Sequence, residues 1–347
     1  MARQISQTSF GEVDGTPVIE TVMQNTSGMR LASCTYGAAI TEISVPDRSG
    51  TIENVVCGFT RAEDYQKHPH FFGATIGPFA GRLENSEIVI DGKRMHLTPN
   101  EGDHLLHGGN DGFHGALWSV ETFEKPDCFI TTYTLTYSKE FPGTIQMEVS
   151  FSLFETNEVV IEYKGSSSES TLLNCTNHTY FNLSGNLSKT VHQHTLQMPA
   201  HSFIPLTEQG LPGGSPLKVE GTLFDFTKEK RLETVLGQTH EQIQRASGGL
   251  DHPFLLEQGP IILTDGYSGR RLMVFTGEPA VVVYTGNKIG SGYRFKEAPA
   301  QNFLGICLEE QNVPNSIKHP HYPSSLLKPH VTYSKKTRYL FDVVEET

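Results

Sequence analysis

Short segments that alternate apolar and polar side chains constrain this chain more than any other feature. Residues 144–155, TIQMEVSFSLFE, place an apolar side chain at every second position: Ile145, Met147, Val149 and Phe151. This period of two is typical of an antiparallel strand with one buried face. Residues 158–165, EVVIEYKG, indicate the next strand, and the intervening FETNE has the composition of a hairpin turn.

Segments rich in Val, Ile, Thr, Tyr and Phe recur at residues 128–138, 280–287 and 337–344, and 33 glycines and 19 prolines punctuate the chain. No strand alternates regularly with a helix of a dozen residues, so a parallel-sheet fold is not expected. The sequence therefore predicts an all-β fold: one large antiparallel β-sandwich that covers residues 1–347 as a single domain, with a few short helices.

Evidence for helices is limited to two segments. Residues 60–68, TRAEDYQKH, space Thr60 and Glu63 as a capping box, which predicts one or two helical turns. Residues 228–244 contain a second segment in which we expect a short helix.

Charge and composition narrow the class of partner. The formal net charge is −12 and no long basic run occurs, which argues against nucleic acid or a membrane surface as partner. The N-terminal residues lack an apolar signal region, and no stretch is long and apolar enough to span a bilayer. Five scattered cysteines without a CxxC motif predict reduced thiols, and we expect a cytoplasmic protein that handles a neutral small molecule.

Two glycine-rich stretches carry polar side chains of types that bind ligands or take part in catalysis. Arg82 lies between small residues and an apolar strand, where it is either a surface arginine or a rigid donor to ligand oxygens. Residues 104–118, HLLHGGNDGFHGALW, contain His104, His107 and His114. A metal site is a weak alternative here, because no third ligand follows at helical spacing; hydrogen bonding of a histidine to ligand hydroxyls fits better.

Two strand-like segments carry titratable groups. In residues 173–182, read as one strand, His178 shares its face with Asn174, Thr176, Tyr180 and Asn182, which suggests the wall of a polar cavity. A buried structural histidine is the alternative. In residues 303–316, FLGICLEEQNVPNS, Glu309 follows an apolar run, where a carboxylate must be paired or functional. Asp251, after a Gly-Gly turn, is a weaker candidate.

Taken in order, these motifs resemble the aldose 1-epimerase (galactose mutarotase) family over nearly the whole chain. The resemblance rests on HPHFFGATIG, GRL, LLHGG, TNHTYFNLSG, LDHPF, YTGN and CLEEQNVPNS. It implies a β-sandwich with an open cleft and interconversion of the α and β anomers of a free aldose. By resemblance, Glu309 is the general base and His178 the general acid, while Arg82, His107 and Asp251 hold sugar hydroxyls. Tyr180, predicted on the face of His178, joins the substrate-binding set.

The chemistry agrees with these roles. Mutarotation removes a proton from the anomeric hydroxyl while another proton reaches the ring oxygen, so the ring opens and recloses on the other face. A histidine with an ordinary pKa near ~6.5 and a glutamate near ~4.3 suit this exchange at neutral pH. The reaction requires neither a metal nor another cofactor, and we expect none.

Several positions depart from the family pattern, and they bear on the substrate. Gly81 precedes Arg82 where the family commonly has Asn, and Val282 stands where a polar residue is frequent; Pro78-Phe79, His114 and His330 also differ. We therefore expect a sugar preference shifted from that of galactose-preferring members, and the sequence does not identify the aldose.

Three other functions remain open: a non-catalytic carbohydrate-binding protein, a mutarotase for a phosphorylated or sulfonated sugar, and a glycoside hydrolase that uses Glu309 and Asp251. A modified sugar would call for extra cationic residues in the cleft. We expect a monomer or a homodimer.

Overall fold

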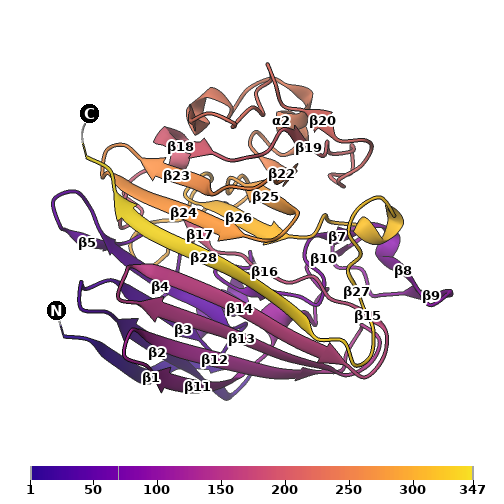
Figure 1. The fold of residues 1–347 in the computed structure, drawn as a ribbon, viewed down its shortest axis with the longest axis horizontal. Coiled ribbons are helices and arrows are strands. Elements are labelled where there is room, and N and C mark those ends of the chain that lie inside the picture. The colour runs from indigo at the N-terminus through magenta and orange to yellow at the C-terminus, as the bar shows by residue number, and fades with distance from the viewer. Residues whose placement is uncertain (1, 69, 346–347) are drawn as a thin grey trace.

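The computed structural model describes residues 2–68 and 70–345, whose regular secondary structure consists mainly of antiparallel β-strands (Figure 1). The predicted all-β sandwich is therefore confirmed. The largest sheet has nine strands, in the order β11 (Ser119–Glu124), β12 (Cys128–Tyr137), β13 (Ile145–Phe154), β14 (Glu158–Ser167), β28 (Tyr333–Val343), β24 (Arg270–Thr276), β23 (Ile261–Asp265), β18 (His194–Gln197) and β21 (Lys230–Arg231). The strands predicted from residues 128–138, 144–155, 158–165 and 337–344 all belong to it.

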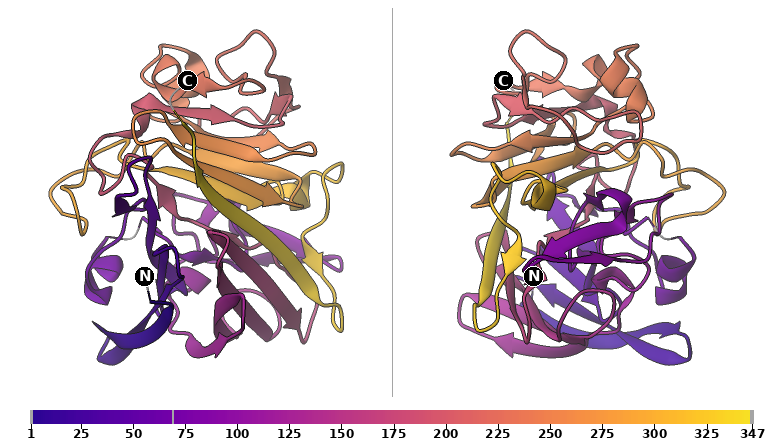
Figure 2. Two further views of the ribbon diagram at one scale, coloured as in Figure 1. Left: turned by 60° about the vertical axis from the view of Figure 1, so that its left-hand side comes forward. Right: turned by 90° about the vertical axis from the view of Figure 1, so that its right-hand side faces the viewer.

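Two further sheets form the other layer of the sandwich, which Figure 2 shows from the side. The five-stranded sheet consists of β1 (Gln4–Val13), β2 (Thr16–Gln24), β3 (Arg30–Cys34), β4 (Ala39–Pro46) and β5 (Ile52–Asn54). The six-stranded sheet has the order β17 (Tyr180–Phe181), β26 (Ile306–Gln311), β25 (Ala280–Tyr284), β22 (Asp251–Leu255), β19 (Ser202–Phe203) and β20 (Leu217–Lys218).

Short two-stranded pairs complete the β-structure. They are β7 (Arg82–Leu83) with β10 (Leu105–Leu106), β6 (Thr75–Ile76) with β16 (Thr176–Asn177), β8 (Glu87–Ile90) with β9 (Lys93–His96), and β15 (Thr171–Leu172) with β27 (Leu326–Leu327). Single 3₁₀ turns lie at Glu84–Ser86, Phe113–Gly115, Val191–Gln193, Leu232–Thr234 and Ser316–Lys318.

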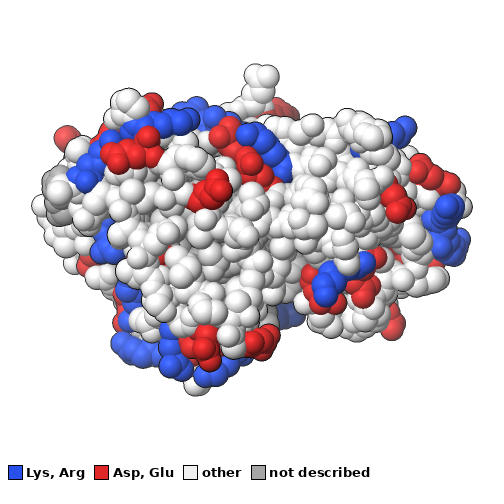
Figure 3. Space-filling view, turned by 90° about the horizontal axis from the view of Figure 1, so that it is seen from below, with Lys and Arg blue, Asp and Glu red and all other residues white. Residues whose placement is uncertain are grey.

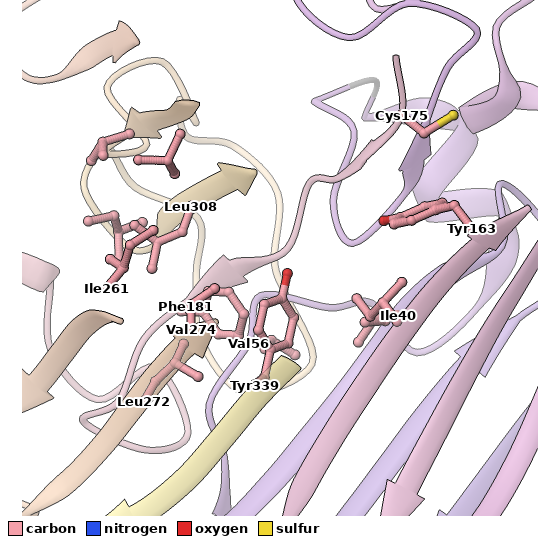
Figure 4. Close-up of a cluster of buried hydrophobic side chains, with 14 of the residues drawn as sticks. Ile40, Val56, Tyr163, Cys175, Phe181, Ile261, Leu272, Val274, Leu308 and Tyr339 are labelled. Carbon is pink, nitrogen blue, oxygen red and sulfur yellow. The ribbon is translucent and has the colours of Figure 1, made fainter. Parts of the chain in front are cut away.

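Apolar side chains from both layers meet in the core of the sandwich. Figure 4 shows Phe181 and Leu308 of the six-stranded sheet beside Val274 and Tyr339 of the nine-stranded sheet. The rings of Phe181 and Tyr339 meet edge to face, with centroids 5.4 Å apart, a favourable aromatic geometry. Burial of the inner row of each sheet fixes the strand register, because a slip of one residue would turn that row toward solvent.

The two predicted helical segments exist, but both differ in detail from the prediction. Helix α1 (Ala62–Lys67) begins after Arg61 without a side-chain cap, so the predicted capping box of Thr60 and Glu63 is wrong. Instead, the Glu63 carboxylate accepts a hydrogen bond from the backbone N–H of Glu12, at 3.2 Å. The second segment is divided between the turn Leu232–Thr234 and helix α2 (Glu241–Arg245), with Gly237 in a left-handed conformation between them.

Among the described residues, no helix has the length and apolar character needed to cross a membrane. On the face seen in Figure 3, basic side chains lie beside acidic ones.

Candidate active site

A cavity of about 190 Å³ lies over the six-stranded sheet, and all six residues singled out from the sequence line it: Arg82, His107, His178, Tyr180, Asp251 and Glu309. They come from segments far apart in the chain. Its volume is below the ~300–1,000 Å³ of sites for drug-sized ligands and suits a single small ring.

Glu309 stands near the middle of β26, between β17 and β25, and its side chain is turned into the cavity. Val282 of β25 is its neighbour in register, and the Gln311 amide donates to its carboxylate at 3.5 Å. Glu310 leaves the same strand on the opposite face, where Tyr339 donates its hydroxyl proton to the Glu310 carboxyl at 3.5 Å. Only one of the two adjacent carboxyls therefore borders the cavity.

The segment around His178 is not the continuous strand that the sequence predicted. Asn177 accepts hydrogen bonds from the Thr179 N–H (3.1 Å) and hydroxyl (2.5 Å), and this local turn separates β16 from β17. Of the expected polar face, only His178 and Tyr180 line the cavity. The Asn182 amide donates to backbone carbonyls and has a structural role.

The turn fixes His178 in place. Its N–H donates to the Ala74 carbonyl at 2.9 Å, and its carbonyl accepts from the Gly73 N–H at 3.0 Å. On the ring, Nε2 lies 3.5 Å from Glu309 Oε1, while Nδ1 lies 3.4 Å from the buried Cys307 Sγ. An imidazole nitrogen and a carboxyl oxygen are thus in direct contact on the wall of the cavity.

Burial changes the acid–base properties of both groups, so the ordinary pKa values assumed from the sequence are wrong for this site. Burial raises the pKa of Glu309 well above its usual range; Asp251 adds to the rise and Arg82 opposes it. Burial lowers the pKa of His178 to about 3. Both shifts have the same physical cause, since a low-dielectric site disfavours a net charge. Near neutral pH the two groups therefore share one exchangeable proton and carry no net charge together.

Arg82 forms one wall of the cavity. Its guanidinium donates two parallel hydrogen bonds to Glu101, at 2.5 and 2.9 Å, and its Nη1 lies 3.8 Å from the Asp251 carboxylate. The pairing of β7 with β10 brings the loop that carries Glu101 over Arg82. Such a bidentate pair holds the guanidinium plane in one orientation, so Arg82 is not a free surface arginine.

His107 is oriented by the backbone. Its Nδ1 accepts a hydrogen bond from the Gly81 N–H at 3.2 Å, so in the neutral ring Nε2 carries the proton. Burial lowers the pKa of His107 well below its usual value, and the neighbouring His178 and Arg82 add to this effect. The neutral ring is therefore a hydrogen-bond donor at Nε2. Neither His104 nor His114 lines this cavity.

His107, His178 and Glu309 place one ligand atom each within 4.8 Å of one another, the donor set of a possible metal site. The chemistry of His107 does not fit this use. Because its Nδ1 already accepts from the Gly81 N–H, a metal at Nε2 would have to displace the remaining ring proton. The arrangement suits proton transfer better than metal ligation.

Two of the departures from the family pattern, Gly81 and Val282, border the cavity. Gly81 adopts a left-handed conformation with φ of 78°, and a Cβ atom there would lie 2.7 Å from Pro314. Pro314 thus occupies the space that a larger residue would need. Val282 lines the cavity beside Glu309, where its methyl groups offer no hydrogen bond to a ligand.

Sequence reasoning missed several lining residues, notably Glu101, Lys288 and Gln311. Glu101 and Lys288 belong to loops without regular periodicity, so no pattern pointed to them. Gln311 had a signal, because it shares the strand face of Glu309.

A large antiparallel β-sandwich whose cavity pairs a buried carboxyl with a buried imidazole has the architecture of an acid–base enzyme. Residues 20–340 match the family model of aldose 1-epimerase, and the chain belongs to this family, as its motifs predicted. The predicted class, an isomerase, is thereby confirmed.

Individual relatives cover almost the whole chain. It is 33% identical to the galactose mutarotase of Sus scrofa, over 98% of this chain and 99% of the relative. It is 35% identical to the aldose 1-epimerase of Haemophilus influenzae, over 92% of this chain and 93% of the relative. Among solved structures, galactose 1-epimerase from Lactobacillus acidophilus superposes with a TM-score of 0.88 at 27% identity, covering 99% of this chain and 100% of that one.

Proposed function

We propose that the protein is an aldose 1-epimerase that interconverts the α and β anomers of a free aldose through ring opening and reclosure. The observation that carries the proposal is the 3.5 Å approach of Glu309 Oε1 to His178 Nε2 inside a cavity that fits one sugar ring. Two groups so placed can serve the anomeric hydroxyl and the ring oxygen of one substrate.

The protonation state of the His178–Glu309 pair suits this reaction. With the shared proton on His178, the imidazolium protonates the ring oxygen while the Glu309 carboxylate accepts the proton of the anomeric hydroxyl. The C1–O5 bond breaks and leaves an open-chain aldehyde, a neutral imidazole and a protonated carboxyl. After rotation about C1–C2, the same transfers run backwards and the ring closes on the other face.

Throughout this cycle the pair keeps its net charge at zero. The step moves one proton from His178 to Glu309 by way of the sugar, so no uncompensated charge is left in the buried site. This matters because an isolated charge would be costly there. The shifted pKa values favour the neutral imidazole with the protonated carboxyl, which is the arrangement that accompanies the open-chain sugar.

The remaining residues position the ring. Arg82 and the neutral, Nε2-protonated His107 donate hydrogen bonds to substrate oxygens, and Asp251 accepts from hydroxyls. The hydroxyl of Tyr180 already donates to the His70 carbonyl at 2.8 Å. Tyr180 therefore contributes the face of its ring as an apolar wall rather than a polar contact.

Location and oligomeric state are part of the proposal. We propose a cytoplasmic location because all five cysteines are buried free thiols, as expected in a reducing compartment. We also propose a monomer or a homodimer.

Polarimetry tests the function directly. Freshly dissolved pure anomers of D-galactose, D-glucose, D-xylose, L-arabinose and L-fucose are followed with and without the protein, after exhaustive treatment with EDTA. We expect faster equilibration of at least one aldose and no effect of EDTA, because the acid–base pair needs no metal. A protein that binds sugar without accelerating equilibration would be a carbohydrate-binding module. Activity lost on chelation and restored by a divalent cation would contradict the metal-free mechanism.

The pH dependence of kcat/KM follows from the two shifted pKa values. On the acid side, kcat/KM falls when the pair takes up a second proton. Because the pKa of His178 is lowered to about 3, this happens only at strongly acidic pH. On the alkaline side, kcat/KM falls when the pair loses its shared proton. Because the pKa of Glu309 is raised, this loss is shifted to higher pH. We therefore expect a flat profile from about pH 5 to 8, measured by polarimetry with buffer catalysis subtracted. An inflection near ~6.5, the ordinary histidine value, would show that His178 is not shifted.

A further inference from the structure

Phe71 borders two separate hollows of the molecule. One is the acid–base cavity, and the other is a pocket of about 320 Å³ lined by residues of helix α1, of the segment after β3 and of the loop that carries His114. We call this other space the α1 pocket; its lining side chains include Tyr36, Tyr65, Gln66 and His114. Among the described residues, Phe71 is the one that lines both spaces, so its side chain lies between them.

The ring of Phe71 contacts three imidazoles. Its centroid lies 4.7 Å from that of His107 and 5.7 Å from that of His178, the two histidines of the acid–base cavity. The centroid of His114, on the side of the α1 pocket, is also 4.7 Å away. One apolar ring thus stands between the α1 pocket and both histidines of the acid–base cavity.

The backbone holds Phe71 in a conformation that a bulky residue rarely adopts, with a left-handed φ of 60°. The Phe71 carbonyl accepts a hydrogen bond from the Ala74 N–H at 3.0 Å, which closes a turn. The same turn is bonded to His178 twice, because the Gly73 N–H donates to the His178 carbonyl and the His178 N–H donates to the Ala74 carbonyl. Strained residues persist where the surrounding structure fixes them, and they cluster at functional sites. The strain therefore points to a role of this ring beside His178.

Burial dominates the acid–base properties of these histidines. It lowers the pKa of His178 to about 3 and that of His114 to about 4, and it is the main cause of the lowered pKa of His107. The groups that face His178 are Glu309 and Cys307 from β26, Tyr180 from β17, Tyr284 from β25 and His107 from the loop after β10, while His70 and His114 lower its pKa further. A substitution at position 71 changes none of these groups. Water in place of the ring would solvate the imidazolium and so raise the pKa of His178.

We propose that Phe71 is a positioning residue of the acid–base site: its ring closes the wall between the cavity and the α1 pocket, and thereby keeps water away from His178 and His107. This inference rests on the proposed mutarotase function. With the wall closed, the proton that His178 and Glu309 share is exchanged only with the sugar, because no water reaches the pair from the α1 pocket.

The variant Phe71→Ala tests the proposal, since it removes the ring and joins the two spaces. We expect the pKa of His178 to return toward its ordinary value of ~6.5. NMR titration of the imidazole in the sugar-free, full-length protein measures this pKa, and His178→Asn assigns the signal. The pair then takes up its second proton nearer neutral pH, so kcat/KM should fall by about tenfold or more from pH 8 to pH 5, against less than about twofold in the wild type. Phe71→Leu keeps an apolar side chain in the wall and should keep the flat profile.

Phe72→Ala is the matched control, the same change at the adjacent residue. Of the two spaces, Phe72 lines only the α1 pocket, and its buried ring packs against Tyr180 and Phe295, with centroids 4.6 and 4.9 Å apart. Its loss should lower the melting temperature more than the loss of the half-buried Phe71 does, and it should leave the pH profile of kcat/KM flat.

Phe71→Gly makes the same opening on a left-handed backbone that suits glycine, and it replaces the alanine variant if that variant does not fold. An unchanged His178 pKa in the folded variant, a flat profile, or the same inflection in Phe72→Ala overturns the proposal. Unfolding of both Phe71→Ala and Phe71→Gly also overturns it, because the ring would then serve the fold. A wild-type protein that anomerises no sugar overturns the proposed function, and the NMR titration still decides whether Phe71 keeps water from His178.

Discussion

Replacing Glu309 with glutamine is expected to lower turnover at saturating sugar by at least about 10²–10⁴-fold, the range for loss of a positioned general base. Glutamine keeps the shape of the side chain and its contact with Gln311, but its amide cannot take the proton of the anomeric hydroxyl. Because glutamine is neutral and close in shape to the protonated carboxyl, the substitution adds no buried charge, and the protein should stay folded. Polarimetry gives kcat, and circular dichroism confirms the fold.

Glu310→Gln is the matched control, since it makes the same chemical change at the adjacent residue on the other face of β26. Its turnover should remain within about twofold of the wild type, because Glu310 contacts Tyr339 and not the cavity. Comparable losses of turnover in both variants, with the fold intact, would refute the assignment of Glu309 as the sole base.

The effect of Glu310→Gln should appear in stability. Burial raises the pKa of Glu310 to about 8, so the folded protein binds a proton that the unfolded chain, with a carboxyl near ~4.5, has already lost. Wild-type stability should therefore fall as pH rises from about 4.5 to about 8 through this group, and the glutamine variant should lack that contribution. Urea unfolding at several pH values measures it.

Replacing His178 with asparagine is the second substitution with a large expected effect, a loss of about 10²–10⁴-fold in kcat. Asparagine can hydrogen-bond but cannot donate a proton to the ring oxygen at neutral pH. It also leaves Glu309 without the partner that shares its proton, so the flat pH profile should be lost. Both kcat and its pH dependence are needed to separate this role from simple binding.

His107→Asn is the comparison for His178→Asn. His107 holds its Nε2 proton as a donor to the sugar, a contact made in both ground and transition states, so its loss should raise KM more than it lowers kcat. If His107→Asn lowered kcat and His178→Asn raised only KM, the two roles would have to be exchanged.

Features that depend on local periodicity could be predicted from the sequence. Alternation in residues 144–155 identified β13, and the same alternation separated Glu309 from Glu310, because adjacent residues of a strand leave on opposite faces. The six proposed site residues could be named because each lies in a compact motif. The structure then brings them around one cavity.

Features that depend on distant parts of the chain could not be predicted. The capping box at Thr60 failed because β1 presents a backbone N–H to Glu63. The pKa values of His178 and Glu309 depend on how far the fold excludes water from them, which no local pattern shows. Glu101 reaches Arg82 only through the pairing of β7 with β10.

The close contact of Gly81 with Pro314 has a consequence for the evolution of the site. An asparagine at position 81 can adopt the left-handed backbone, but its Cβ would meet the proline ring at 2.7 Å. Introduced alone, it would be harmful, whereas after a change at position 314 it would be tolerated. The effects of substitutions at the two positions are thus expected to be non-additive, because the cost of a side chain at position 81 depends on the residue at position 314.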